Sequence, residues 1–355
     1  MKLNLALAGF GNVARRFVRL LREREAELAA LGLEPVIVGI STKRHGAVFS
    51  PRGIDAVEQA ERLERDAHAG LGDGVAAAVK DTFAMIARTG DLWQPGALVE
   101  TTVLDIAAGQ PAIDHVRAAI RAGLNVVTAN KGPAAFAARA LQAEAADKGV
   151  SLLFEGAVMD GVPVFNLVRE TLPAARVLGF EGVVNTTTNQ MLVAIERGET
   201  AASALARMQA EGIAEADPSL DLDGWDAAAK AAALANVLID SSGPGITPRD
   251  VDREGLGPDV DERVRAASAR GMRLKLIAGA RLEHGRVRAE VKLREVDPQG
   301  PFGSLDGPAN ALRLDTDLVG PIVITQLEGS LTATAYALVS DLVRVAQRLQ
   351  GRRTG

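Results

Sequence analysis

A glycine-rich turn between an apolar run and an amphipathic pattern is the feature that most constrains the fold of this chain. Residues 3–8 have the composition of a buried strand, and residues 15–30 place apolar side chains among charges at helical spacing. The turn between them reads Gly9-Phe10-Gly11-Asn12-Val13-Ala14, a G-x-G-x-x-A pattern. Because residues 35–40 predict a second strand, the start of the chain predicts a βαβ unit of a parallel sheet.

The same turn has the pattern of a dinucleotide-binding site. In such sites the first glycine allows the tight turn, the second lets the backbone approach a pyrophosphate, and a small third residue lets the helix pack closely on the strand. The start of the helix adds N–H groups and the positive end of its dipole. We interpret five consecutive residues as binding a cofactor: Gly9, Phe10, Gly11, Asn12 and Val13. The alternative is a glycine turn in another kind of α/β protein.

The end of the second strand favours NADP over NAD. An acidic residue there would bind the ribose 2′-hydroxyl of NAD, but the strand ends Ile40-Ser41-Thr42-Lys43-Arg44. Two hydroxyls and two cations suit a 2′-phosphate, which they would hold by charge-assisted hydrogen bonds. Ser41, Lys43 and Arg44 are therefore candidate cofactor-binding residues. The alternative is that Lys43 and Arg44 belong to an ordinary solvated loop.

Strand and helix patterns alternate up to about residue 150 and then change. The first part predicts a doubly wound α/β sheet, with strands at 97–102, 124–128 and 150–154 and helices at 111–122 and 133–148. The second part predicts an α+β module with an antiparallel or mixed sheet. Its segments are a helix near 161–171, a long β-prone run at 177–187, two or three helices between 189 and 240, a helix at 259–270, β-prone stretches at 272–282, 286–296 and 318–326, and a last helix at 332–350.

Composition narrows the classes of function. The 355 residues include no cysteine, which excludes disulfides, cysteine-ligated zinc, iron–sulfur clusters and a catalytic thiol. The formal charge of −5, without a basic stripe, argues against nucleic-acid binding. No apolar stretch reaches the ~18 residues of a membrane span, and the start of the chain lacks the features of a signal peptide. A cytoplasmic protein without nucleic-acid or membrane partners is therefore expected.

The residues from Glu215 to Lys230 are the densest group of chemically useful side chains. Five carboxylates lie within 12 residues and precede the lysine: Glu215, Asp217, Asp221, Asp223 and Asp226. Asp226 and Lys230 are spaced i,i+4 and so share a helix face. Acids beside one lysine suit a substrate with an amino group and a lysine that transfers a proton. The alternatives are an exposed ion pair of little consequence and a calcium loop, whose characteristic glycine and final acid are missing.

A second lysine follows a predicted strand in Thr128-Ala129-Asn130-Lys131-Gly132-Pro133. The carboxyl ends of strands are where open α/β sheets bind ligands, whereas the alternative for Lys131 is a surface lysine that begins a helix. The histidines are scattered without H-x-H or H-E-x-x-H, so a zinc site is not expected. Gly-x-Ser-x-Gly is also missing, which removes support for a hydrolase elbow.

Together these segments resemble the homoserine dehydrogenases, NAD(P)-dependent oxidoreductases that interconvert homoserine and aspartate 4-semialdehyde. The landmarks of the family occur in order along nearly the whole chain: Gly9-Phe10-Gly11-Asn12-Val13, Thr128 to Pro133, Glu155 to Val164, Asn185-Thr186-Thr187-Thr188-Asn189, and Glu215 to Lys230. The resemblance implies a nucleotide-binding Rossmann domain made of residues 1–150 and 330–355. An α+β catalytic and dimerisation domain, residues 151–329, would be inserted into it. The pathway implied is threonine and methionine biosynthesis.

The resemblance also implies roles for individual residues. Lys230 would exchange a proton with the reacting oxygen, and Lys131 would be a second catalytic lysine near the nicotinamide. Asp226 would complete the catalytic set. The substrate would be held by Glu215, at its ammonium group, and by Asp221 and Thr187. Further cofactor contacts would come from Thr101, Thr102, Asn130 and Gly329. A monovalent cation such as sodium would bind in the loop of Glu155, Val158, Asp160 and Val162.

Members of the family are homodimers built through the sheet of the second domain, which implies the same for this chain. The chain resembles a short form without a fused aspartokinase or a C-terminal ACT regulatory domain, so threonine inhibition through that module is not expected. It departs from the family pattern at Met159, Asp160 and Thr186, which replace smaller residues. It also departs in the late glycine-rich cofactor loop, which reads Leu327-Glu328-Gly329-Ser330-Leu331.

Two other functions stay open at this point. One is an NADP-dependent reductase of a related amino-acid semialdehyde or keto acid. The other is a non-catalytic nucleotide-binding sensor, which would keep the glycine turn but would not need Lys131 and Lys230. Aspartate-semialdehyde dehydrogenase is excluded because it needs a nucleophilic cysteine.

Overall fold

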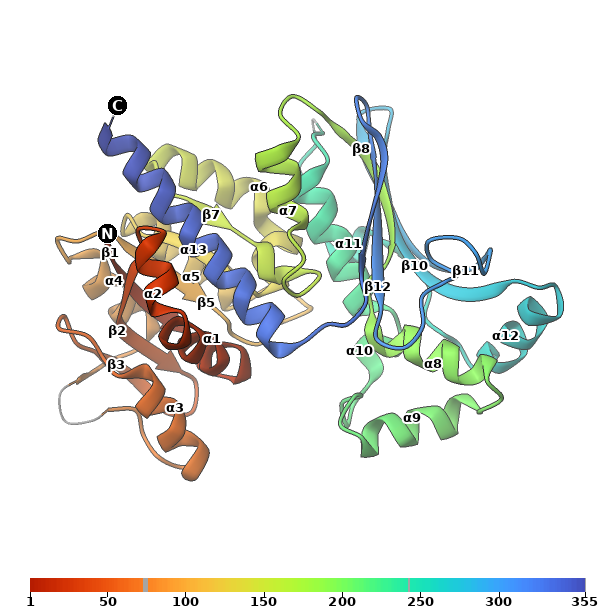
Figure 1. Ribbon diagram of the computed structural model, residues 1–355, viewed down its shortest axis with the longest axis horizontal. Helices are drawn as coiled ribbons and strands as arrows, with labels where there is room; N and C mark the ends of the chain where they lie inside the picture. The colour runs from red at the N-terminus through yellow and green to blue at the C-terminus, as the bar shows by residue number, and fades with distance from the viewer. Residues whose placement is uncertain (73–75, 242, 355) are drawn as a thin grey trace. The chain divides into compact units, whose positions relative to one another are not determined.

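The computed structural model describes residues 1–72, 76–241 and 243–354, and the chain divides into two compact units (Figure 1). Unit 1 consists of Met1–Pro133, Ala137–Phe165 and the described residues from Ser330 onward. Unit 2 consists of Ala134–Phe136 and Asn166–Gly329. Each unit has one sheet with helices packed against it, which confirms the predicted α/β class with a second sheet domain.

A mostly parallel sheet of seven strands forms the centre of unit 1. β1 lies between β2 and β5 and is parallel to both, and β6 and β7 continue the parallel part beyond β5. Because the chain leaves β1 on one side and later returns to β5 on the other, a crevice is expected at the carboxyl ends of these two strands. The order is β4 (Ala77–Val79), β3 (Gly46–Phe49), β2 (Glu34–Thr42), β1 (Lys2–Ala8), β5 (Gly96–Glu100), β6 (Asn125–Thr128) and β7 (Leu152–Leu153).

Helices cover both faces of this sheet. They are α1 (Asn12–Glu23), α2 (Glu25–Ala30), α3 (Ala56–Arg65), α4 (Thr82–Gly90), α5 (Ala112–Arg121), α6 (Lys131–Lys148) and α13 (Leu331–Thr354). Leu3, Leu5 and Leu7 alternate along β1 and are buried in a core shared with α1, α3 and α13. Met85 of α4 and Ile120 of α5 are buried outside that cluster, where these two helices pack together against the strands. The unit is therefore doubly wound, as the alternating pattern predicts.

A mixed sheet of six strands forms the centre of unit 2. β8 pairs antiparallel with β10 and β12, and the short β9 joins parallel to β11. The order is β13 (Gly320–Gln326), β12 (Asn310–Thr316), β8 (Val177–Val183), β10 (Arg273–Glu283), β11 (Arg286–Val296) and β9 (Asp252–Arg253). The helices of this unit are α8 (Thr186–Glu196), α9 (Ala201–Ala210), α10 (Ser219–Leu222), α11 (Trp225–Leu238) and α12 (Val260–Ala269).

Two predicted helices differ from the structure. The helix expected over 15–30 breaks at Arg24, whose φ of −118° and ψ of 24° lie outside the helical region, and α2 then sets Leu28 against the core. The helix expected near 161–171 shrinks to the single turn α7 (Val164–Asn166) and a π-helical turn, Leu167–Thr171. Pro163 explains the late start, because a proline disfavours helical backbone at the residue before it.

The β-prone run predicted over 177–187 is wrong after Val183. Asn185 accepts a hydrogen bond at Oδ1 from the N–H of Thr188 at 2.8 Å, so the chain turns into α8 at Thr186. β12 is not predicted from the sequence, and its pairing with β8 joins segments far apart in the chain. Within the described residues, no helix is both long and apolar enough to cross a bilayer.

Candidate functional site

The glycine turn follows β1 and lies beside the loop that follows β5. Gly9 has a φ of +90°, and a Cβ at this position would lie 2.7 Å from the backbone carbon of Thr101. Thr101 Oγ1 donates to the carbonyl of Gly9 at 3.1 Å, and the N–H of Gly9 donates to the carbonyl of Ser41 at 2.9 Å. Backbone conformation and lack of space therefore both require glycine at residue 9.

The second glycine of the turn faces open space. Nothing lies within 4 Å of the place that a Cβ of Gly11 would occupy. Gly11 precedes α1, whose start has no side-chain cap and no acidic residue in its first turn, which contains Asn12 and Val13. Phe10 is buried and packs its side chain into the core of the unit. These residues fit the pyrophosphate of a dinucleotide, because uncapped N–H groups at a helix start are donors for an anion.

The end of β2 offers cations rather than hydroxyl groups. Ser41 is buried, and its hydroxyl group is hydrogen-bonded to Thr82 Oγ1 at 2.6 Å. The hydroxyl group of Thr42 accepts a bond from the backbone of the following turn at 2.7 Å. Lys43 and Arg44 are exposed in that turn between β2 and β3, and neither forms an ion pair with any residue that the structure describes. Of the predicted phosphate-binding groups, Ser41 is buried, Thr42 is half-buried, and the two cations are exposed.

Four predicted residues lie where β5 and β6 end: Thr101, Thr102, Asn130 and Lys131. Asn130 Nδ2 donates to the carbonyl of Thr102 at 2.9 Å and so joins the two loops. Asn130 Oδ1 accepts from the N–H of Gly132 at 2.8 Å and caps α6. Lys131 is the half-buried first residue of that helix. The fold of unit 1 thus gathers these residues at the sheet edge that also carries the glycine turn.

Lys230 and Asp226 form a largely buried ion pair on α11. The Nζ of Lys230 lies 3.0 Å from Oδ2 of Asp226, one helical turn earlier, and it donates to the carbonyl of Val184 at 2.5 Å. The two side chains are 14% and 16% exposed. Because little water surrounds them, screening weakens this pair less than it weakens a surface pair.

Asn185 connects the ion pair to a second carboxylate. Its Nδ2 donates to Asp221 Oδ1 at 2.7 Å and to Asp226 Oδ2 at 2.9 Å. Asn185 lies in one of the family landmarks, and the sequence alone predicts no catalytic or binding role for it, although an asparagine before a run of threonines is a helix-start signal. Lys230, Asp226 and Asp221 therefore belong to one network in unit 2.

Three other predicted residues lie outside that network. Glu215 is exposed in the loop between α9 and α10, and its carboxylate forms no hydrogen bond or ion pair with a described residue. Thr187 is 8% exposed in the first turn of α8. Gly329 lies in the link from β13 to α13, just before Ser330, whose hydroxyl group accepts a bond from a backbone N–H of the helix.

The loop predicted to hold a cation begins with a buried carboxylate. Glu155 is 2% exposed, and its Oε1 accepts from the N–H of Phe165 at 2.9 Å. Its own N–H donates to Oδ2 of Asp341, a fully buried residue of α13, also at 2.9 Å. Two residues that lie 186 positions apart in the sequence are therefore hydrogen-bonded inside unit 1.

The rest of this loop is shaped by Asp160. This residue has a φ of +46°, and its Oδ1 accepts from Thr334 Oγ1 at 3.0 Å. Val158 is buried, and the carbonyl of Val162 accepts the N–H of Val164 at 2.8 Å. In the described part of the chain, no group of three or more acidic or histidine side chains is placed to hold a metal ion.

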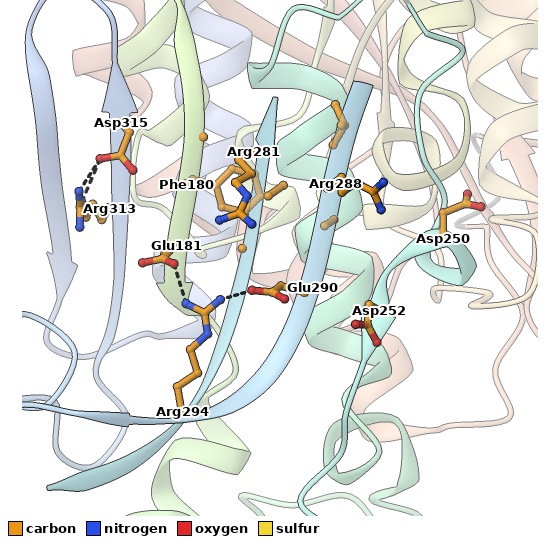
Figure 2. A pocket seen from close by; sticks show the side chains of 15 residues that line it. Phe180, Glu181, Asp250, Asp252, Arg281, Arg288, Glu290, Arg294, Arg313 and Asp315 are labelled. Atoms are coloured by element: carbon orange, nitrogen blue, oxygen red, sulfur yellow. Dashed lines mark hydrogen bonds and ion pairs between the residues drawn. The ribbon is translucent and has the colours of Figure 1, made fainter. Parts of the chain in front are cut away.

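A charged hollow of about 450 Å³ lies over strands β8, β10, β11 and β12 of unit 2. Figure 2 shows Arg294 between Glu181 and Glu290, with Arg313 beside Asp315. None of the predicted catalytic or substrate-binding residues lines it. Charges of both signs on one sheet face are suited to contact with a second protein surface.

Protein-family profiles match both parts of the chain. The family described as homoserine dehydrogenase matches residues 163–343, and the family described as homoserine dehydrogenase, NAD binding domain, matches residues 9–155. An NAD(+)-dependent homoserine dehydrogenase from Pseudomonas canavaninivorans is 34% identical over 346 residues, which cover 97% of this chain and 96% of that protein. A homoserine dehydrogenase from Sulfurisphaera tokodaii is 32% identical and covers 96% of this chain and 98% of its own length.

Solved structures show the same likeness. A homoserine dehydrogenase from Thiobacillus denitrificans has a TM-score of 0.81 and 28% identity, and the match covers 99% of this chain and 74% of that chain. A hyperthermophilic archaeal homoserine dehydrogenase in complex with NADPH has a TM-score of 0.80 and 25% identity, with 98% of each chain covered.

Proposed function

The chain belongs to the homoserine dehydrogenase family, and we propose that it catalyses the NAD(P)-dependent interconversion of L-homoserine and L-aspartate 4-semialdehyde. The observation that carries this proposal is the network of Lys230, Asp226, Asn185 and Asp221 in unit 2. It brings a lysine and two carboxylates together, and a small amino-acid substrate needs a proton carrier and anionic partners. The catalytic domain is proposed to be 151–329, inserted into a nucleotide domain of 1–150 and 330–355.

Lys230 is the group we assign to proton transfer. In the oxidation of homoserine, its neutral amine accepts the proton of the substrate hydroxyl group, and in the reverse direction its ammonium form polarises the aldehyde and returns the proton. Asp226 and the carbonyl of Val184 hold the ammonium form in place. Asp221, Thr187 and Glu215 are assigned to the substrate. The exposed carboxylate of Glu215, which forms no hydrogen bond or ion pair with a described residue, would bind the substrate ammonium group.

NAD(P) supplies the acceptor for the two electrons that leave the alcohol carbon. The turn of Gly9 and Gly11 and the uncapped start of α1 suit its pyrophosphate. Thr101, Thr102 and Asn130 are proposed to border the cofactor, with Lys131 as the second catalytic lysine. Gly329 is proposed as a further contact.

We propose NADP as the preferred cofactor. β2 ends without a carboxylate for a ribose hydroxyl group, and Lys43 and Arg44 are exposed cations in the adjoining turn. The relatives point both ways, because one is named as NAD(+)-dependent and another was solved with NADPH. The proposal of NADP over NAD therefore rests on Lys43 and Arg44 of this chain.

The remaining parts of the proposal concern assembly and setting. A homodimer would form through the sheet of unit 2, where the hollow presents charges of both signs. A monovalent cation would be held by backbone groups of the loop from Glu155 to Val162. The reaction suits a cytoplasmic enzyme of threonine and methionine biosynthesis, because both pathways draw on homoserine.

A steady-state assay tests the activity directly. The purified chain should reduce NADP+ when L-homoserine is added, with D-homoserine, L-serine and L-threonine as control alcohols. We expect L-homoserine to have the highest kcat/KM. One substrate must place its ammonium group at the carboxylates and its hydroxyl group at the lysine at the same time. Absence of homoserine-dependent reduction with either NADP+ or NAD+ would reject the proposal.

A further inference from the structure

Glu100 is a fully buried carboxylic acid that the proposed reaction does not use. It ends β5, the strand beside β1, and pairs in register with Ala8 of β1 and Thr128 of β6. Its side chain forms hydrogen bonds with neutral groups and, among the described residues, no ion pair. Burial of an acid without a counter-ion costs folding free energy. We therefore expect Glu100 to have a role that offsets this cost.

The carboxyl group of Glu100 closes a ring of hydrogen bonds. Oε1 accepts from the N–H of Thr102 at 3.0 Å and from the hydroxyl group of Thr102, and Oε2 lies 3.1 Å from Thr128 Oγ1. Thr128 Oγ1 accepts from the N–H of Asn130 at 3.0 Å. Asn130 Nδ2 then donates to the carbonyl of Thr102 at 2.9 Å. The loops after β5 and β6 are therefore tied together through one side chain.

The ring continues into the start of α6. Asn130 Oδ1 caps the helix at the N–H of Gly132, and Lys131 is the first helical residue. A Cβ built on Gly132 would lie 3.0 Å from the Cα of Gly109, so the first turn has little room to shift. A displacement of Asn130 would thus be transmitted to the backbone that carries Lys131.

The ring can close with Glu100 in either protonation state. A carboxylate accepts the proton of the Thr128 hydroxyl group at Oε2. A carboxylic acid donates to Thr128 Oγ1, which then donates to the carbonyl of Glu100 at 3.1 Å. Burial raises the pKa of Glu100 to about 7, and the hydrogen bonds from Thr102, Thr128 and Asn130 oppose that rise. The neutral acid is therefore a well-populated form near neutral pH, and a glutamine can imitate it.

We propose that Glu100 is a positioning residue for the dehydrogenase reaction, because its carboxyl group holds the two loops at the cofactor edge and sets the place of Asn130 and Lys131. This inference rests on the proposed function, since it assigns these loops to cofactor binding. Glu100 acts through its neighbours rather than by touching the reacting atoms.

The test compares Glu100→Gln, which can close the ring, with Glu100→Ala, which opens it. Three quantities are measured: the Kd of NADPH from its fluorescence, kcat with L-homoserine, and amide hydrogen exchange over residues 129–133.

For Glu100→Ala we expect kcat to fall at least ~10-fold, because small misplacements of catalytic groups have effects of this size. NADPH should bind more weakly, and exchange over 129–133 should be faster while the last turns of α6 are unchanged. Glu100→Gln and the exposed control Glu58→Ala should stay within about 3-fold of wild type in kcat and Kd.

Two results would overturn the proposal. One is a folded Glu100→Ala variant with wild-type kcat, Kd and exchange, even if it melts at a lower temperature. The other is a Glu100→Gln variant as impaired as Glu100→Ala, because it keeps the contacts. If Glu100→Ala does not fold, Thr128→Val removes only the hydroxyl group between Glu100 and Asn130, and it must show the same three changes or the proposal fails.

The readouts also separate this proposal from the proposed activity. Absence of homoserine-dependent turnover in the wild type would reject the activity alone. NADPH affinity and exchange over 129–133 do not need homoserine, so they still test whether Glu100 positions the loops.

Discussion

Two buried ionisable side chains show how the surroundings of a residue, rather than its type, set its behaviour. Lys275 of β10 is fully buried, and its Nζ donates to Asn189 Oδ1 and to the carbonyl of Leu305, both at 2.7 Å. Burial lowers the pKa of Lys275 to about 8, whereas it raises that of Glu100 to about 7. In both cases burial favours the neutral form. Lys230, by contrast, forms an ion pair with Asp226 at 3.0 Å.

Replacing Lys230 by alanine tests the proton carrier. We expect kcat to fall by about 10²–10⁴-fold, the usual contribution of a general acid–base group, while the Kd of NADPH stays within about 2-fold because unit 1 supplies the glycine turn. The exposed Lys148→Ala is the matched control and should keep wild-type turnover. Near-normal kcat in Lys230→Ala would remove this residue from the mechanism.

The raised pKa of Glu100 predicts a pH-dependent stability difference. Below about pH 4.5 the acid is neutral in the folded and the unfolded chain, so no stability is lost there. As pH rises through about 7, the folded state releases its proton later than the unfolded state does, so wild type loses about 3 kcal/mol of unfolding free energy. Glu100→Gln cannot titrate, so its stability relative to wild type should increase by that amount between pH 4.5 and 8. Urea unfolding across this window measures it, and a pH-independent difference would contradict the prediction.

At the scale of the element, the turn after β1 combines a backbone requirement with a steric one. Gly9→Ala must adopt a φ of +90° and place its Cβ 2.7 Å from Thr101. Gly123→Ala must adopt a φ of +74° but meets no steric contact, since nothing lies within 4 Å of its Cβ. We expect Gly123→Ala to lose about 1 kcal/mol of stability and Gly9→Ala to lose more, about 2–4 kcal/mol.

Only Gly9→Ala should also weaken NADPH binding, by at least ~10-fold, because a shifted turn moves the start of α1. Thermal unfolding and NADPH titration of both variants check the two parts. Equal losses in the two variants would mean that the contact with Thr101 relaxes without cost.

The turn between β2 and β3 is the element that we expect to select the cofactor. The double variant Lys43→Ala/Arg44→Ala removes both exposed cations. We expect KM for NADP+ to rise about 10- to 100-fold, because two charge-assisted contacts to a 2′-phosphate are lost, and KM for NAD+ to change less than about 3-fold. Parallel steady-state series with the two cofactors give the comparison. Equal changes in both KM values would show that the turn between β2 and β3 does not bind the 2′-phosphate of NADP+.

At the scale of the whole molecule, the sheet of unit 2 predicts a dimer. Light scattering after size exclusion should give twice the mass of one chain. Arg288 lines the charged hollow, so Arg288→Glu should weaken dimerisation at least ~10-fold through like-charge contacts across the interface. Arg286→Glu, at the exposed start of β11 and outside the hollow, is the control. A monomeric wild type would reject the dimer, and a dimer unaffected by Arg288→Glu would place the interface elsewhere.

The sequence by itself determined what depends on neighbours in the chain. The positive φ of Gly9 is a requirement of the local backbone, and periods of 2 and 3.6 residues predict strands and helices whichever partners they later find. The spacing of Asp226 and Lys230 likewise predicts their contact within one helix. Local pattern fails where a helix-start residue outweighs β propensity, as at Asn185.

Only the tertiary structure decided which of these groups meet and which are buried. Asn185 reaches Asp221 and Asp226 across 36 and 41 residues, and Glu155 reaches Asp341 across 186. The burial of Glu100 likewise depends on β1 and β6, which flank β5 in the sheet. Hydrogen bonds and desolvation depend on distance in space, and a chain can bring any two of its segments together only by folding. The glycine turn and the lysine that singled out this family are local features, whereas the network that makes the lysine useful is a product of the fold.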